Sequence, residues 1–68
     1  MTVYVIVCSG QYTETIDEKP TTAYAAEAVS AFRSYENALK AMEAPLKPKQ
    51  PERWTEPGFG ICTVELED

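Results

Sequence analysis

The stretch TTAYAAEAVSAFRSYENALKAMEA, residues 21–44, decides the fold, because all of it suits a helix and part of it also suits a strand. It contains eight alanines, and alanine is the best helix former. Its larger apolar residues recur every three or four positions, which is typical of one face of a helix about five turns long. Thr21 or Thr22 suits the N-cap, and Pro45 marks the end. We therefore expect one long helix here.

A competing interpretation divides the same stretch into a strand and a shorter helix. Tyr24–Phe32 would then be the strand, and the helix would begin at Tyr35 with Ser34 as its N-cap. Alanine is depleted in strands, so the long helix is favoured, with a break near Arg33 and Ser34.

The N-terminal segment is the clearest strand. Thr2–Cys8 (TVYVIVC) is β-branched or aromatic and apolar on both alternating faces, which predicts a central position in a sheet. Ser9 and Gly10 then form a turn signal, and Gln11–Ile16 returns with strand-forming residues. The sequence predicts a β-hairpin that the charged segment Asp17–Pro20 ends.

The C-terminal part combines a proline-rich connection with a strand. Residues 45–57 contain four prolines and predict an extended connection that Trp54 pins to the body, with a short helical turn near that tryptophan. Phe59–Glu67 alternates apolar and polar residues, which predicts a half-buried strand. Its apolar residues are expected to face the core: Cys62, Val64 and Leu66.

Together these segments predict a single domain, residues 1–68, of the α+β class. We expect a small antiparallel β-sheet of about three strands in β-β-α-β order. One long helix packs on one face of the sheet, and a short helical turn lies near Trp54.

The charge balance limits the possible partners. Eleven acidic residues and six basic ones give a formal charge of −5. Affinity for nucleic acid comes from neutralising phosphates, so we expect no direct binding to nucleic acid or to an anionic membrane. No run of eighteen apolar residues exists, so we expect no membrane span. Negative charge also keeps a small protein soluble, and bulk composition favours that simpler explanation.

Catalytic chemistry finds little support in the residue types. The chain contains no histidine, and its two cysteines, Cys8 and Cys62, sit in apolar runs where packing explains them. We expect no catalytic residue, no metal site, no cofactor and no enzyme activity.

The acidic residues become informative once they are placed on the expected elements. We expect the free face and the ends of the sheet to carry an acidic, partner-binding surface, with a tyrosine such as Tyr4 or Tyr12 as an aromatic anchor. An ordinary solvated sheet face is the alternative, and spacing alone favours it. The predicted partner-binding residues are Glu14, Asp17, Glu18, Glu65, Glu67 and Asp68, with Tyr12, Glu36 and Glu43 as secondary candidates.

In overall character the chain resembles the anti-CRISPR proteins, which are small, acidic, phage-encoded inhibitors of bacterial immunity. More specifically, it resembles an inhibitor of a type I-C CRISPR-Cas system. Three segments carry the resemblance: MTVYVIVCSGQYTE at residues 1–14, AYAAEAVSAFRSYENALKAMEA at residues 23–44, and CTVELED at residues 62–68.

The resemblance implies a non-enzymatic inhibitor that binds a CRISPR surveillance complex. Its acidic surface would imitate DNA and occupy the basic DNA-binding surface of the large, Cas8-type subunit, where the PAM of the target DNA is recognised. The chain would act as a monomer in the cytoplasm of the infected bacterial host. The alternative is a phage host-takeover or accessory protein that binds a different protein partner.

Overall fold

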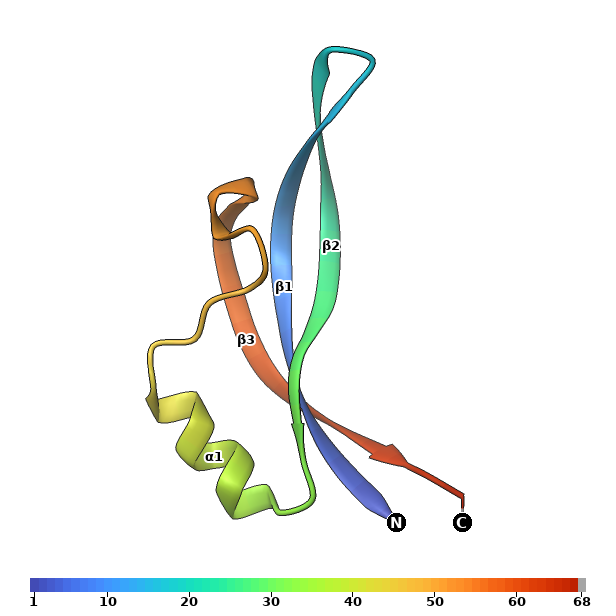
Figure 1. Ribbon diagram of the computed structural model, residues 1–68, viewed down its shortest axis with the longest axis vertical. Helices are drawn as coiled ribbons and strands as arrows, with labels where there is room; N and C mark the ends of the chain where they lie inside the picture. The colour runs from blue at the N-terminus through green and yellow to red at the C-terminus, as the bar shows by residue number, and fades with distance from the viewer. Residues whose placement is uncertain (68) are drawn as a thin grey trace.

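The computed structural model describes residues 1–67, which form a three-stranded antiparallel sheet with one short helix (Figure 1). The sheet has the order β2-β1-β3, so the first strand is central and pairs on both sides. The α+β class is therefore present. In chain order the elements are β1 (Thr2–Ile16), β2 (Lys19–Phe32), α1 (Tyr35–Glu43), the 3-10 helix η1 (Pro51–Arg53) and β3 (Trp54–Glu65).

The long helix expected over residues 21–44 is wrong. Strand β2 takes the first half of that stretch, and α1 has only nine residues. Helix propensities differ by less than about 1 kcal/mol per residue, whereas β1 offers β2 a backbone partner along almost its whole length. The competing interpretation is the correct one. The Ser34 side chain caps α1 by accepting a hydrogen bond from the Asn37 N–H at 3.4 Å.

The prediction of an N-terminal hairpin is also wrong in the positions of its strands and its turn. Strand β1 runs through Ser9 and Gly10 without a turn, so Gln11–Ile16 is its second half and not a separate strand. The expected β-β-α-β order is consequently not confirmed with the residues predicted for it. Its first two strands form one strand, the second strand comes from residues expected to be helical, and the short helix lies between β2 and β3. The turn instead consists of Asp17 and Glu18.

Gly10 serves a close approach between strands. The register of β1 against β3 shifts between Ser9 and Gln11, where β3 bulges toward β1. A Cβ atom at Gly10 would lie 3.2 Å from the Cα atom of Pro57. Glycine is thus needed for the β3 bulge, which is a common reason for glycine inside a strand.

The core lies on one side of the sheet, between the strands and a layer made by α1 and the connection. The even-numbered residues of β1 point to this side, which we call the helix side. Tyr4 packs edge-to-face on Tyr35 of α1, with ring centroids 5.5 Å apart. The buried apolar residues are Ile6, Cys8, Ala38 and Trp54, and Pro48 of the connection is also buried.

Within residues 1–67, no helix is long and apolar enough to cross a membrane.

Three hydrogen bonds fasten the connection across the helix side. The Lys49 N–H donates to the Glu27 carboxylate at 2.8 Å, and the indole N–H of Trp54 donates to the Lys49 carbonyl at 3.3 Å. The Tyr12 hydroxyl donates to Oε1 of Gln50 at 2.8 Å. The Tyr12 and Trp54 rings also pack edge-to-face at 5.1 Å. Trp54, directly after η1, therefore holds the connection on the sheet.

Candidate functional site

The second face of the sheet has no covering element within residues 1–67. We call it the open face and define it by the odd-numbered residues of β1 and their cross-strand partners. None of these residues is Lys, Arg, Asp or Glu. The central part of the open face is apolar and consists of Val3, Val5 and Val7 on β1, Ala26, Ala28 and Ala31 on β2, and Cys62 and Val64 on β3.

This arrangement corrects the expected acidic surface on the free sheet face. Glu14 pairs with Thr21 and Glu65 pairs with Thr2, and these register positions belong to the helix side. The aromatic anchors expected beside the carboxylates, Tyr4 and Tyr12, pack on the helix side as well.

The face of β3 that was expected to point to the core is also reversed. Cys62, Val64 and Leu66 are exposed, whereas Phe59 and Ile61 lie on the helix side and are half-buried. Alternation in the sequence separates the two faces of a strand. It does not say which face the helix covers, and this is why the prediction failed.

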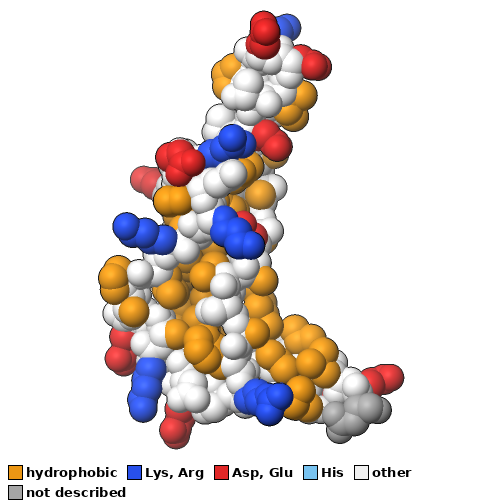
Figure 2. All heavy atoms as spheres, viewed as in Figure 1, with side chains coloured by type: hydrophobic (Ala, Val, Ile, Leu, Met, Phe, Trp, Pro, Cys, Tyr) orange, Lys and Arg blue, Asp and Glu red, His pale blue; other side chains and the backbone are white. Residues whose placement is uncertain are grey.

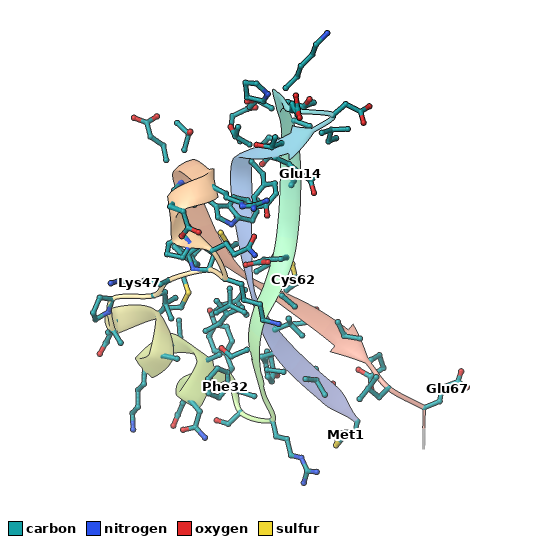
Figure 3. The ribbon with its side chains drawn as sticks, turned by 45° about the horizontal axis from the view of Figure 1, so that its top comes forward. Met1, Glu14, Phe32, Lys47, Cys62 and Glu67 are labelled. Carbon is teal, nitrogen blue, oxygen red and sulfur yellow. The ribbon has the colours of Figure 1, made fainter. Side chains whose placement is uncertain are left out.

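The structure does not bring the predicted acidic residues together. Glu14 lies near the far end of β1, whereas Glu65 pairs at the start of the same strand, roughly 40 Å away at the usual rise per residue. Figure 3 shows Glu14 and Glu67 at opposite ends of the molecule. The remaining predicted residue, Asp68, lies outside the described residues.

The first acidic group is the tip of the β1–β2 hairpin, which we call the acidic tip: Glu14, Asp17 and Glu18. All three residues are exposed. Strand β3 pairs with β1 only as far as Tyr12, so the hairpin continues beyond it as a two-stranded ribbon (Figure 1). Figure 2 shows acidic side chains at the end of this ribbon, with a basic side chain beside them. The acidic tip is the most protruding charged group of the described residues.

The turn at the acidic tip has an uncommon composition. Asp17 and Glu18 form a two-residue turn between Ile16 and Lys19, with φ values of 51° and 64°. Two-residue hairpin turns with positive φ at both positions strongly favour Asn-Gly, Asp-Gly or Gly-Gly. A non-glycine residue in this region costs roughly 1 kcal/mol or more, and glutamate has no short polar group to offset it. This chain therefore carries two carboxylates where other residues suit the backbone better.

The second acidic group is engaged within the molecule. The Glu65 carboxylate accepts a hydrogen bond from the Thr2 hydroxyl at 2.6 Å and lies 3.3 Å from the amino group of Met1. The contact between Glu65 and the Met1 amino group is the one ion pair within 4.0 Å among residues 1–67. Within those residues, the carboxylates of the acidic tip therefore have no basic group at that distance. Glu67 is exposed. Glu65 thus joins the ends of β1 and β3, which leaves it less free to bind a partner.

The secondary candidates lie apart from both acidic groups. Tyr12 is half-buried, and its hydroxyl is bonded to Gln50, so its role in the structure is packing. Glu36 and Glu43 are exposed in the first and last turns of α1, close to Lys40 in sequence. Figure 2 shows basic side chains around the helix and connection, so that surface is mixed in sign.

The two cysteines have different environments. Cys8 is buried, as the sequence predicts, and burial together with the negative charge of Glu27 raises the pKa of its thiol. Cys62 is exposed on the open face, which corrects the expectation that it packs in the core.

Within residues 1–67 there is no pocket and no group of three or more Cys, Asp or Glu side chains placed to hold a metal ion.

Comparisons of this chain with protein-family models, curated proteins and solved structures find no match. The feature that sequence reasoning missed is the open face. One signal could have found it, because Val3, Val5 and Val7 make the second face of the first strand as apolar as the face occupied by Ile6.

Proposed function

We propose that this protein is a non-enzymatic inhibitor that binds a type I-C CRISPR surveillance complex through its acidic tip and blocks recognition of the target DNA at the PAM. The proposal joins the sequence resemblance to anti-CRISPR proteins with the position of the acidic tip. It narrows the predicted binding residues to Glu14, Asp17 and Glu18, because Glu65 is engaged within the molecule.

The observation that carries the proposal is the pair of carboxylates in the positive-φ turn. Residues kept in an unfavourable backbone conformation cluster at functional sites, because selection there acts on binding and not on stability. Asp17 and Glu18 are exposed and have no ion pair within 4.0 Å in the described part of the chain. Their carboxylates are available to a basic partner.

The mechanism is electrostatic competition with DNA. A DNA-binding groove presents lysines and arginines that grip phosphates, and a protruding acidic ribbon offers these cations carboxylates instead. Association between opposite charges is steered over a distance and weakens as salt rises. While the ribbon occupies the groove, the target duplex is kept out.

The test is target-DNA binding by a purified type I-C surveillance complex, measured with and without this protein. We expect the protein to reduce DNA binding and to co-purify with the complex at low salt, with both effects weaker at high salt. Unchanged DNA binding, together with no co-purification at low salt, would refute the proposal.

A second candidate function is an accessory phage protein that binds an unrelated host protein. The open face favours it, because an apolar, uncharged surface suits a partner without a basic groove. Such binding would be nearly insensitive to salt, which separates it from the first proposal.

A further inference from the structure

We infer that the open face binds a second copy of this chain, so that two sheets pack face to face as a sandwich. This inference is independent of the proposed inhibition through the acidic tip, and it competes with the second candidate function for the open face. It replaces the monomer expected from the sequence. It rests on the shape of the single copy, on the area of the open face and on the side chains found there.

The single copy is more extended than a protein of its size. Its radius of gyration is 14.1 Å, whereas about 11 Å is expected for a compact chain of this length. Its accessible surface is 5173 Å², against about 4,300 Å² for a typical monomer of 7.6 kDa. The single copy therefore exposes more surface than a compact chain of the same mass.

The core on the helix side is small for a chain of this length. Only five residues are buried among residues 1–67, and the largest fully buried side chains are those of Ile6 and Cys8. A three-stranded sheet needs a packed hydrophobic face for independent stability, and domains below about 70 residues rarely have stability to spare. Covering the open face would add the apolar burial that one copy lacks.

The area of the open face is sufficient for a dimer. Residues 3–13 of β1 with their partners span about 36 Å along the strands and about 14 Å across them, or about 500 Å² per copy. Two copies face to face would bury about 1,000 Å², the level that a specific interface should reach.

The side chains of the open face also favour a second copy of this chain as the partner. The face has no charge, so it offers a basic or acidic partner nothing to pair with, and two copies can meet there without like charges opposing each other. In the central part of the open face, valine, alanine and glycine make a surface flat enough for a second sheet at about 10 Å, and the exposed Tyr24 lies beyond that part. A flat apolar face is self-complementary, as a two-fold dimer interface must be.

The first test is the mass in solution, measured by sedimentation equilibrium over a range of protein concentrations. We expect a dimer of 15.2 kDa, twice the chain mass of 7.6 kDa. The variant Ala28→Glu places a charge on the open face and should weaken the dimer at least tenfold. Ala23→Glu is the matched control, because Ala23 is an exposed alanine of the same strand that pairs with Tyr12 on the helix side. It should leave the dimer unchanged.

A second measurement uses the native chain and does not depend on the folding of a variant. Cys62 is an exposed thiol on the open face, whereas Cys8 is buried. The rate at which iodoacetamide alkylates Cys62 should therefore fall as the protein concentration rises through the dimer dissociation constant.

Two results would overturn the inference. One is a 7.6 kDa mass at all concentrations, with an alkylation rate that does not change. The other is a folded Ala28→Glu variant that dimerises as tightly as the native chain. Either result leaves the proposed function standing, because inhibition by the acidic tip is assayed separately.

Discussion

Val5 of β1 and Cys62 of β3 face each other across the sheet, on the side that α1 leaves open. Their neighbours Ile6 and Ile61 form the adjacent pair on the helix side, where Ile6 is completely buried. The two faces of one sheet therefore differ in role. The helix side holds the core and the fastened connection, and the central part of the open face is apolar and uncharged. Glu14 and Glu65 lie near opposite ends of the sheet.

The contrast between the two cysteines gives a prediction about pH. The raised pKa of Cys8 means that the folded state holds the thiol proton more tightly than the unfolded state does, for which the ordinary value is 9.0. The free energy of unfolding should therefore be unaffected by this group below pH 9 and should fall above it, by up to about 1.4 kcal/mol per pH unit.

Urea titrations across this pH range, at one protein concentration, would measure the effect. The difference in unfolding free energy between native chain and Cys8→Ala should narrow or change sign above pH 9, since Cys8→Ala lacks the thiol. Cys62→Ala serves as the control and should follow the native chain. A difference between native chain and Cys8→Ala that stays constant with pH would contradict the assignment.

The packing of Trp54 gives a prediction about stability. This side chain is buried against Tyr12 and bonded to the Lys49 carbonyl, so Trp54→Ala removes both contacts and should cost about 3 kcal/mol or more. Trp54→Phe keeps the aromatic packing and loses the indole N–H, which should cost about 1–2 kcal/mol.

Chemical denaturation followed by circular dichroism would measure both variants, since fluorescence loses its one tryptophan. Equal stability of the native chain and Trp54→Phe would show that the Lys49 hydrogen bond contributes nothing. A Trp54→Ala variant as stable as the native chain would show that the connection is held elsewhere.

The turn at the acidic tip gives a prediction of increased stability. Asp17→Asn with Glu18→Gly creates the residue pair that a positive-φ two-residue turn favours, and it should raise the unfolding free energy by about 1 kcal/mol. Thermal unfolding at fixed concentration measures this gain. Glu43→Gln with Glu52→Gln is the charge-matched control, because it removes two exposed carboxylates that lie outside the turn and have no positive φ. A double variant at the turn that is less stable than this control would be evidence against the strain argument.

Much of the sheet could be predicted from the sequence, because Thr2–Cys8 and the alternation after Phe59 identify strands directly. The helix was harder to predict, because the alanines of this stretch fit both the alternation of a strand and the repeat of a helix. Ala23 and Ala25 fall on one face of β2 and Ala26 and Ala28 on the other, yet the same residues also fit a helical stripe.

Contacts between residues far apart in the sequence decide between strand and helix here. Strand β2 pairs with β1 from Tyr4 to Ile16, and the Glu27 carboxylate receives the Lys49 N–H, a contact between residues 22 positions apart. Local propensity contains no information about either. Ser34 was the one local signal for the correct boundary, because its side chain caps α1.

The candidate site could be predicted in its residue types and not in its arrangement. Glu14, Asp17 and Glu18 come together because they share a hairpin. Glu65 lies far away because it pairs at the opposite end of β1, and that depends on strand register, which spacing along the chain does not give.

The proposed function depends on the carboxylates of the acidic tip, and the same turn variant tests it directly. The measurement is inhibition of target-DNA binding by the type I-C surveillance complex, with native chain, Asp17→Asn/Glu18→Gly and Glu43→Gln/Glu52→Gln compared at equal concentration. We predict that the turn variant is folded and at least as stable as the native chain, yet inhibits at least tenfold less. The control should inhibit like the native chain. A folded turn variant that inhibits as strongly as the native chain would contradict the proposal.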